Sequence, residues 1–502
     1  MTSRISATIQ AAFLARAPQD IVIDTGTESI TAAQLLAVTA ELQDQLKSAG
    51  VCRLALLAAN SPAWIVADIA AQNADICLLP LPTFFSDEQL SHSLNAVGVD
   101  AILTDNPARI INLLPSHSVL ATSPSITSLM LVMVKNAAHI ELPLDAAKIT
   151  FTSGSSGQPR GVCLSLEQQL NVARGLYSAL HIDAPRHLCL LPLSTLLENI
   201  GGVYYPLLAH GSVIVPSETD TGFSGSANLD IDKMLRMFDR HRPISSILLP
   251  QMLIGLVAAL QAGWQPPAEL RFVAVGGGKV APDLLRKARA FGFPVYEGYG
   301  LSEAGSVVCL NVPDATRIGS VGKPLPHVTV SVNDGEVGVS GNTFLGYLDD
   351  PASWGSSTVA TGDIGKLDPD GYLHLAGRRK NLLISSFGRN ISPEWVESEM
   401  LRASEIRQCV VFGDGRPYCT ALLTAESHMV TDAMLQQAIS LINAGLPDYA
   451  RVERWCRLEE PLTVADGLFT DNGRPKRKAI FRRYKNILSQ LYTPLPIERT
   501  AS

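Results

Sequence analysis

The chain has 502 residues, of which 46% are hydrophobic, and this length and composition predict about three domains with large packed cores. Its formal net charge of −7 and the lack of a basic block argue against a protein whose main partner is nucleic acid. The eight cysteines are scattered without Cys-x-x-Cys spacing, which argues against a zinc motif or a disulfide framework and fits reduced thiols in a cytoplasmic enzyme.

The N-terminal segment predicts a short helix. Arg4 and Arg16 occur there without an apolar core or a cleavage site, so the segment is not expected to be a secretory signal. Apolar residues recur at helical spacing, namely Ile5, Ile9, Ala12 and Phe13. We expect this stripe to pack on the domain, and a membrane anchor is the alternative. No run of about 18 apolar residues occurs, so no membrane-spanning helix is expected.

The most informative stretch is residues 150–162, which read Thr-Phe-Thr-Ser-Gly-Ser-Ser-Gly-Gln-Pro-Arg-Gly-Val. Glycines let the backbone approach an anion, hydroxyl and amide groups donate to phosphate oxygens, and Arg160 adds a positive charge. The stretch therefore predicts a polyphosphate-binding loop, with a flexible surface loop as the alternative. It is not a Walker A loop, because it contains no G-x-x-x-x-G-K-[ST] pattern.

The loop resembles the phosphate loop of the adenylate-forming superfamily, which contains acyl-CoA synthetases, luciferases and the adenylation domains of peptide synthetases. That loop runs roughly Thr-Ser-Gly-Ser-Thr-Gly-x-Pro-Lys-Gly, and this chain departs from it with Ser156 for Thr and Arg160 for Lys. Ser keeps the hydroxyl and Arg keeps the charge, so we expect phosphate binding to survive. The resemblance implies a catalytic role for Arg160 and ATP-binding roles for Thr152, Ser153, Gly154, Ser155, Ser156 and Gly157.

Residues 191–198, Leu-Pro-Leu-Ser-Thr-Leu-Leu-Glu, resemble the substrate segment of long-chain synthetases. Those enzymes commonly carry His, beside the substrate carboxylate, where Thr195 stands, and a Glu three residues later, which Glu198 matches. Thr195 is therefore a candidate substrate residue, either as a hydrogen-bond donor or as part of the pocket wall. No acid lies between Arg186 and Leu197, where peptide-synthetase domains have an aspartate for the substrate amine, and this disfavours an amino-acid substrate.

The middle of the chain predicts a parallel sheet covered by helices. Residues 219–228 are expected to form a loop or small insertion. Residues 271–275 predict a strand, 276–278 a glycine turn, 282–290 a helix and 294–297 a second strand, which together make a β-α-β unit. Gly277 in that turn is a candidate substrate contact.

Residues 298–305, Gly-Tyr-Gly-Leu-Ser-Glu-Ala-Gly, present an aromatic ring, a hydroxyl and a carboxylate together. A carboxylate beside bound phosphates can hold Mg²⁺. By resemblance to the family pattern Gly-Tyr-Gly-x-Thr-Glu, Tyr299 contacts adenine, Ser302 contacts the phosphates and Glu303 is the magnesium ligand and a catalytic residue. The alternative is a helix with Ser302 as N-cap and Glu303 in its first turn.

The segment after residue 360 predicts the rest of the nucleotide site. Thr361-Gly362-Asp363 resembles the ribose-binding motif, and Arg378 matches an arginine near the nucleotide; an ordinary turn and a solvated cationic turn are the alternatives. The composition changes at residues 377–381, Gly-Arg-Arg-Lys-Asn, so we expect domains at 1–379 and 380–502 with a hinge at Lys380. Ser392 as N-cap and Pro393 at the first position predict a helix in the second domain.

The resemblance implies an α/β fold, with a large N-terminal region of layered parallel-rich sheets and helices and a small mobile α+β C-terminal domain. Residues 388–393, Gly-Arg-Asn-Ile-Ser-Pro, resemble the loop that borders the pantetheine channel, which makes Gly388 a candidate cofactor contact. Residues 377–393 and 410–418 are most similar in pattern to the long-chain fatty acyl-CoA synthetases.

Residues 471–477, Asp-Asn-Gly-Arg-Pro-Lys-Arg, resemble the family motif Asn-Gly-Lys-x-x-Arg, whose lysine stabilises charge during adenylation. The alignment puts Arg474 at that position, and arginine can substitute because it is always charged. Lys476 is the second candidate for this catalytic role, and a solvated basic segment is the alternative.

The resemblance as a whole implies an AMP-forming acid–thiol ligase that uses ATP, Mg²⁺ and CoA, or the phosphopantetheine of a carrier protein. The expected substrate is a medium- or long-chain fatty acid. Three alternatives remain open: a carrier-protein ligase, an acyl-AMP synthetase, and a nucleotide or acyl sensor in which the changes at positions 160, 195 and 474 have weakened turnover.

Overall fold

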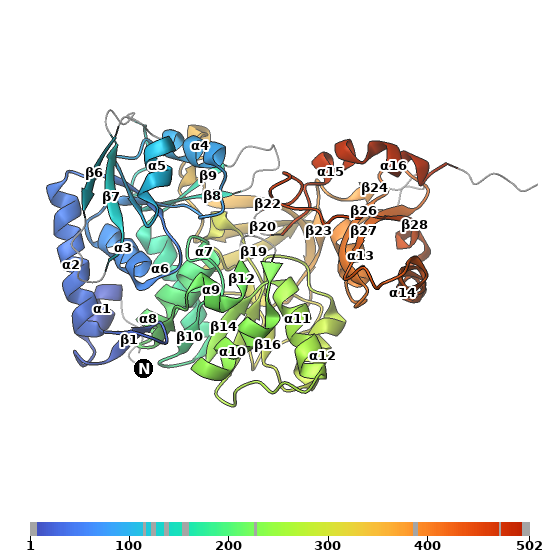
Figure 1. Cartoon of the computed structure of the whole chain (residues 1–502), viewed down its shortest axis with the longest axis horizontal. Coiled ribbons are helices and arrows are strands. Elements are labelled where there is room, and N and C mark those ends of the chain that lie inside the picture. The colour runs from blue at the N-terminus through green and yellow to red at the C-terminus, as the bar shows by residue number, and fades with distance from the viewer. Residues whose placement is uncertain are drawn as a thin grey trace, which may run out of the picture. The chain divides into compact units, whose positions relative to one another are not determined.

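The computed structural model of the chain describes residues 8–113, 117–121, 127–134, 140–152, 160–224, 228–384, 390–470 and 473–493 (Figure 1). The chain divides into two compact units. The first comprises residues 1–277, 285–361 and 366–374, and the second comprises residues 278–284, 362–365 and 375–502. The division therefore passes through strands β22 (Thr358–Leu367) and β23 (Leu373–Arg378).

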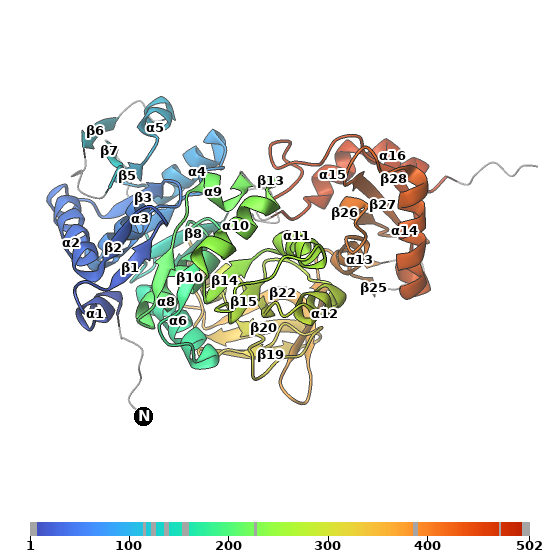
Figure 2. The same cartoon turned by 60° about the horizontal axis from the view of Figure 1, so that its bottom comes forward.

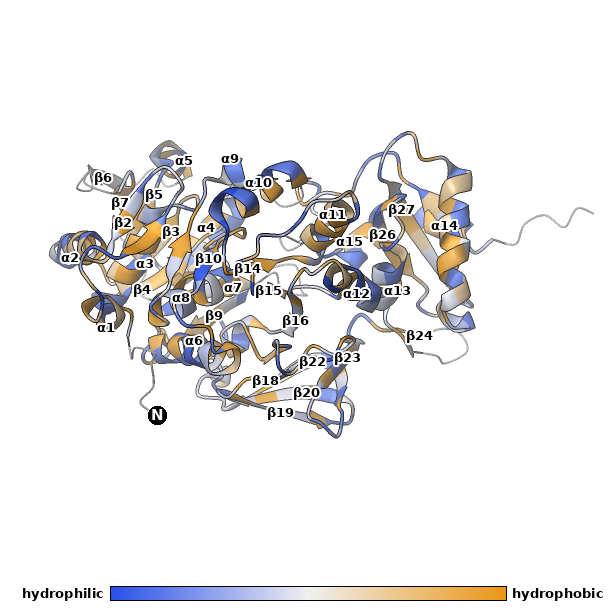
Figure 3. Cartoon of the chain, turned by 90° about the horizontal axis from the view of Figure 1, so that it is seen from below, coloured by the Kyte–Doolittle hydropathy of each residue, from blue (hydrophilic) through white to orange (hydrophobic). Residues whose placement is uncertain are grey.

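An eight-stranded sheet carries the ends of the predicted phosphate loop. Its strands, in spatial order, are β21 (Gly346–Tyr347), β9 (Arg160–Leu164), β8 (Lys148–Thr152), β4 (Cys77–Pro80), β3 (Arg53–Leu57), β5 (Ala101–Thr104), β7 (Met130–Val134) and β6 (His117–Ala121). Strands β8, β4, β3 and β5 run parallel, and the edge pairs are antiparallel. After Arg53, strand β3 is an apolar run of four buried residues, coloured as hydrophobic in Figure 3, as expected for a strand whose two faces are both covered.

Helices of the first sheet begin at clear local signals. They are α2 (Ala32–Ser48), α3 (Pro62–Asn73), α4 (Asp87–Val97) and α5 (Pro107–Leu113). Ser61 accepts a hydrogen bond from the Trp64 amide and Pro62 occupies the first helical turn, so α3 starts where local chemistry directs it.

A nine-stranded sheet forms the second half of the first unit. Its order is β18 (Lys323–Pro324), β17 (Cys309–Leu310), β16 (Val295–Tyr299), β15 (Phe272–Val275), β14 (Ser245–Leu248), β10 (Arg186–Leu188), β11 (Ser212–Ile214), β1 (Ile21–Asp24) and β2 (Ser29–Thr31). The run from β16 to β1 is parallel. The predicted β-α-β unit is confirmed: β15 and β16 are joined by α12 (Pro282–Ala290), which starts at the expected proline.

One apolar core joins the two large sheets. It includes residues of α3, of α6 (Leu166–Leu180) and of α8 (Tyr205–Leu208), and the last two helices lie side by side (Figure 2). Further helices accompany the second sheet, namely α10 (Ile231–His241) and α11 (Pro250–Gln261). A four-stranded sheet, β19 (Val328–Asn333), β20 (Glu336–Gly341), β22 and β23, completes the layers. Its first hairpin turns at Asp334-Gly335, both at positive φ, as a two-residue turn requires.

The second unit is a small α+β fold. Strands β26 (Ile406–Phe412), β27 (Cys419–Ala425) and β28 (Val452–Arg457) form one sheet, and β24 (Leu383–Ile384) pairs with β25 (Asn390–Ile391). Its helices are α13 (Pro393–Met400), α14 (Asp432–Gly445), α15 (Arg477–Arg483) and α16 (Lys485–Gln490). The predicted start of α13 is confirmed, because Ser392 accepts from the Trp395 amide and Pro393 is the first helical residue.

Two predictions about the first unit can be compared with the structure. Helix α1 (Ile9–Leu14) buries Ile9, Ala12 and Phe13 in the main core, which supports the packed helix over the anchor; Ile5 lies outside the described residues. The stretch 219–228, expected to be a loop or small insertion, contains in its described part the end of α9 (Glu218–Thr221), β12 (Phe223–Ser224) and the start of β13 (Asn228–Leu229). Among the described residues, no helix combines the length and the apolar character needed to cross a membrane.

All eight cysteines are unpaired, and they differ greatly in exposure. Cys52 is exposed, Cys456 is partly exposed and the other six are buried. Burial raises the pKa of Cys77 and of Cys163 to about 12.

Candidate active site

The predicted phosphate loop is closed by a strand pair. Strand β8 ends at Thr152 and β9 begins at Arg160, and these two residues are directly opposite one another in the antiparallel register. The remaining candidates of the loop, Ser153, Gly154, Ser155, Ser156 and Gly157, lie outside the described residues, as does the side chain of Thr152. The structure thus fixes both ends of the loop.

Arg160 lies on an aromatic ring. Its guanidinium carbon is 3.6 Å from the centroid of the Tyr347 ring, which is within the range of a strong cation–π contact. Its Nε is 3.6 Å from Asp349 Oδ1 and its Nη2 is 3.4 Å from Asp350 Oδ2. Tyr347 reaches this position because β21 pairs with β9, with Tyr347 opposite Val162.

Glu303 meets the same tyrosine from another element. The hydroxyl of Tyr347 donates to Glu303 Oε1 at 2.8 Å, and the Phe344 amide donates to the Glu303 carbonyl at 2.7 Å. The structure therefore joins the predicted cation of the phosphate loop, Arg160, to the predicted magnesium ligand, Glu303, through a residue that the sequence did not single out.

Ser302 and Glu303 open a single 3₁₀ turn, η2 (Ser302–Ala304), whose N-cap is Leu301 and which Gly305 ends at φ 66°. The alternative in which Ser302 caps a helix is therefore wrong. Gly300 cannot be replaced easily here, because a Cβ would overlap the Ser306 carbonyl oxygen. The donor chemistry of Glu303 fits Mg²⁺, since a carboxylate oxygen is a preferred ligand of this ion.

Tyr299 and Gly277 lie at equivalent ends of neighbouring strands. Tyr299 ends β16, is partly exposed and pairs with Cys309, while Gly277 follows the carboxyl end of β15 at φ 81°. Ligands of open α/β sheets bind at the carboxyl ends of parallel strands. These two candidates therefore lie at the edge where a nucleotide or an acyl group is expected.

Thr195 has a local hydrogen bond. Its hydroxyl donates to the Pro192 carbonyl at 2.7 Å, and it precedes the short helix α7 (Leu196–Glu198) without capping it through its side chain. The single hydroxyl proton is thus used within the turn.

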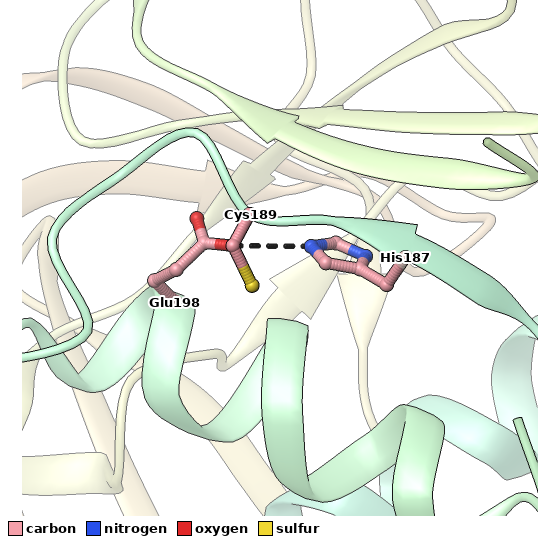
Figure 4. A group of neighbouring side chains, drawn as sticks. All are labelled: His187, Cys189 and Glu198. Carbon is pink, nitrogen blue, oxygen red and sulfur yellow. Dashed lines mark hydrogen bonds and ion pairs between the residues drawn. The ribbon is translucent and has the colours of Figure 1, made fainter. Parts of the chain in front are cut away.

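His187, Cys189 and Glu198 form a buried polar cluster behind this turn (Figure 4). Their donor atoms lie within 4.8 Å of one another, a spacing that could hold a metal ion. They already have hydrogen-bond partners, since His187 Nε2 is 3.1 Å from Glu198 Oε1 and His187 Nδ1 is 3.0 Å from Ser245 Oγ. Burial raises the pKa of the Cys189 thiol well above its usual value. We therefore interpret the cluster as a hydrogen-bond network that fixes the 187–198 segment.

A second buried network anchors β8, the strand that leads into the predicted phosphate loop. Lys148 Nζ, at the start of β8, donates to Asp68 Oδ1 at 2.8 Å, to Asn199 Oδ1 at 2.6 Å and to the Tyr204 hydroxyl at 2.7 Å. Asn199 and Tyr204 are the ends of a π-helical turn, η1 (Asn199–Tyr204). Burial lowers the pKa of Lys148, and the charge of Asp68 opposes this effect. All three ammonium protons are satisfied, so the buried charge is stable here.

Asp363 and Arg378 are brought together in the second unit. Asp363 is buried, and Arg378 Nε donates to its Oδ1 at 2.9 Å. Gly362, at φ 72°, accepts a hydrogen bond from the Arg379 amide, and Lys380 lies exposed in the turn that follows. Gly388 lies outside the described residues.

Arg474 and Lys476 lie around a tight turn. The Thr470 amide donates to the Arg474 carbonyl at 2.7 Å, and the Arg474 amide donates to Thr470 Oγ1 at 3.1 Å, with Gly473 at φ 70°. Arg474 is exposed near the tip, whereas Lys476 is partly exposed and its amide is bonded to the Leu468 carbonyl. The two candidate cations therefore differ in their exposure and in their position along the turn.

Arg477, the first residue of α15, is partly buried and bonded to two acids. Arg477 Nη1 is 3.0 Å from Glu394 Oε1, and Arg477 Nη2 is paired with Glu397. Glu394 Oε1 also accepts from Asn381, next to the predicted hinge, at 2.8 Å. Glu397 Oε1 accepts from the Val411 amide at 2.7 Å. Through Arg477 on α15, the segment after the Arg474 turn is thus tied to α13 and to Asn381 within one unit.

Comparison with protein families identifies the chain. Residues 10–346 match the AMP-binding enzyme family, and residues 380–495 match the C-terminal domain of AMP-binding enzymes. The chain belongs to the AMP-binding enzyme family. This confirms the resemblance to the adenylate-forming superfamily.

Curated relatives of the chain are acid–CoA ligases. The 2-succinylbenzoate–CoA ligase of Bacillus pumilus is 29% identical over 302 residues, which cover 56% of this chain and 59% of that ligase. The long-chain-fatty-acid–CoA ligase FadD15 of Mycobacterium bovis is 24% identical over 429 residues, 69% of each chain. The chain is therefore an enzyme of a family that contains ligases for both kinds of acid.

Solved structures confirm the fold class. The structure of the anthranilate CoA ligase AuaEII in complex with anthranoyl-AMP matches this chain with a TM-score of 0.79 at 17% identity. The match covers 97% of this chain and 98% of the AuaEII chain. The O-succinylbenzoate CoA synthetase of Bacillus subtilis, in complex with ATP and magnesium ion, matches with a TM-score of 0.75 at 22% identity. This match covers 94% of our chain and 98% of the synthetase chain. At these identities the likeness concerns the fold.

Proposed function

We propose that this protein is an ATP-dependent acid–thiol ligase that forms an acyl adenylate and transfers the acyl group to a thiol, with CoA as the acceptor. The observation that carries the proposal is the joining of Arg160 and Glu303 at the closed end of the phosphate loop. A cation and a metal-type carboxylate at the mouth of a Gly/Ser loop suit the triphosphate of ATP.

The first step joins the substrate carboxylate to the α-phosphate and expels pyrophosphate. Glu303 would hold Mg²⁺, which supplies charge neutralisation on the phosphates when bound. Arg160 and the loop amides bind phosphate oxygens, Tyr299 packs on adenine, and Asp363 accepts hydrogen bonds from the ribose hydroxyls. No covalent enzyme intermediate is required, because positioning and charge neutralisation carry the step.

The second step needs a thiol at the adenylate. We place the hinge at Lys380, between a domain of residues 1–379 and a lid of residues 380–502, with Gly388 bordering the thiol channel. Arg474 or Lys476 supports adenylation. The exposed position of Arg474 at the tip of its turn favours it as the group that reaches a substrate.

The acid we propose is a medium- to long-chain fatty acid, and an aromatic acid is the second candidate. The first is favoured by the long-chain-like segments at 377–393 and 410–418, the second by relatives named for 2-succinylbenzoate and anthranilate. Thr195 carries no charge and uses its proton on Pro192, which suits an apolar wall in either case.

A panel of free acids with ATP tests the proposal by pyrophosphate release. We expect specificity to climb with chain length, since each buried methylene contributes about 0.8 kcal/mol until the channel is filled. Release that needs neither CoA nor a carrier protein, with no thioester formed when either is added, would indicate an acyl-AMP synthetase. A thioester formed only with a carrier protein would indicate the carrier-protein ligase. ATP binding without any acid-dependent release would indicate a sensor.

A further inference from the structure

Tyr347 lies between the two charged side chains of the proposed phosphate site. Its hydroxyl donates to Glu303 Oε1 at 2.8 Å, and its ring lies 3.6 Å from the guanidinium carbon of Arg160. We propose that Tyr347 is a positioning residue that fixes both Glu303 and Arg160 for the magnesium complex of ATP. The inference rests on the proposed function and adds a residue to its site.

Tyr347 is itself held from several sides. Its amide donates to Ser353 Oγ at 2.9 Å, and its carbonyl accepts from Trp354 Nε1 at 2.8 Å. The Phe344 ring meets the Tyr347 ring edge-on, with centroids 4.7 Å apart and planes at 76°. A side chain that is locked in this way can fix its partners before a ligand arrives.

The hydroxyl restrains the carboxylate of Glu303. This carboxylate stands on a short 3₁₀ turn, and its two oxygens can exchange places by rotation about the last side-chain bonds. A fixed donor at Oε1 selects one orientation and sets the direction of the second oxygen. The ordering is then present before the metal complex binds, which lowers the entropy cost of binding.

The ring restrains Arg160 without occupying its N–H donors. A cation–π contact uses the face of the guanidinium and leaves its edge for a phosphate. The other partners, Asp349 and Asp350, have side chains 64% and 45% exposed and lie 3.6 and 3.4 Å away, so these ion pairs are weak in water. A phosphate can displace the aspartates while the ring keeps the guanidinium in place.

The test separates the hydroxyl from the ring by measuring ATP affinity at a series of Mg²⁺ concentrations, by titration calorimetry. Tyr347→Phe keeps the ring and removes the hydroxyl. We expect the Mg²⁺ concentration for half-maximal ATP binding to rise about tenfold, the size expected for losing one hydrogen bond to a charged group. ATP affinity at saturating Mg²⁺ should be nearly unchanged, because Arg160 keeps its support.

Tyr347→Leu removes both functions and should weaken ATP binding even at saturating Mg²⁺. Tyr372→Phe is the matched control, since the Tyr372 ring also makes cation–π contacts. Its centroid is 4.4 Å from the guanidinium carbon of Arg317 and 4.8 Å from Lys323 Nζ. It should bind ATP with wild-type magnesium dependence. A thermal unfolding midpoint without ATP verifies that each variant is folded.

A second comparison keeps the test decisive if packing changes. In a Glu303→Gln background, Tyr347→Phe should add no further loss of ATP affinity, because its partner no longer binds the metal. The proposal is wrong if Tyr347→Phe shows wild-type magnesium dependence, if Tyr372→Phe shifts it equally, or if the two changes act independently. If the wild-type protein itself shows no magnesium-dependent ATP binding, the proposed function fails as well.

Discussion

Two cations, the buried Lys148 in the first unit and the partly buried Arg477 in the second, are neutralised in different ways. Lys148 has one acid, Asp68, and two neutral acceptors. Arg477 is shared between two acids, Glu394 and Glu397. The first network is balanced, so losing its acid leaves an unpaired buried charge. The second has one acid more than it needs, and burial raises the pKa of Glu397 to about 7.

The largest expected effect breaks the balanced network. Asp68→Ala should cost about 3–5 kcal/mol of local stability, because Lys148 remains buried without its counter-charge. Hydrogen exchange of peptides that span β8 and η1 measures this loss. Asp87→Ala is the control: Asp87 is 67% exposed and paired with Arg109 on the surface, so it should cost less than about 1 kcal/mol. A similar small loss at Asp68 would contradict the comparison.

The unbalanced network should make the second unit sensitive to pH. The folded pKa of Glu397 is about 7 against an ordinary value of 4.5, so between these values the folded state binds more protons than the unfolded state. Stability should therefore fall as the pH rises from 4.5 to 7, by up to about 3 kcal/mol, and stay level above that.

Glu397→Gln should remove this slope, because Glu394 still neutralises Arg477 and the amide does not titrate. Hydrogen exchange of β26 and β27, corrected for the intrinsic effect of pH, reports it. An equal slope in the variant would assign the titration to another group.

The smallest expected effect is in the first unit, where stability should fall as the pH is lowered rather than raised. Burial lowers the pKa of His327 to about 4, and its Nε2 lies 3.0 Å from the Val307 carbonyl. The unfolded state, at 6.5, binds the proton more readily, so stability should fall by about 1–2 kcal/mol as the pH drops from 6.5 to 5. His327→Gln should flatten this dependence in exchange of β19. A loss of β19 protection that is the same in both proteins would exclude His327 as its source.

Local features of the fold could be predicted from the sequence. Pro282 begins α12 and Ser392 caps α13, because prolines and hydroxyl caps act on their own neighbours. The β-α-β unit at 271–299 followed from the spacing of apolar residues and glycines. The short elements α9 and β12 were not predicted individually, since they carry no period long enough to detect.

Polar partners that are distant in sequence could not be predicted. Tyr347 lies 44 residues from Glu303, and Lys148 lies 80 residues from Asp68, and no local pattern specifies such pairs. The sequence did contain a sign that Asp68 is buried. Asp68 interrupts an otherwise apolar stretch of α3, from Ala63 to Ala71, and a lone acid there must find a buried partner. The identity of that partner is a property of the fold.

The uneven exposure of the thiols makes the natural chain suitable for optical labelling. The reactive form of a cysteine is its thiolate, and burial holds six of the eight thiols in the protonated, inaccessible state. A maleimide dye at neutral pH should therefore attach first to Cys52. One added cysteine on the second unit, for example at Leu441, which is 78% exposed, completes a donor–acceptor pair. The distance between the two units during a catalytic cycle then becomes measurable in single molecules by energy transfer.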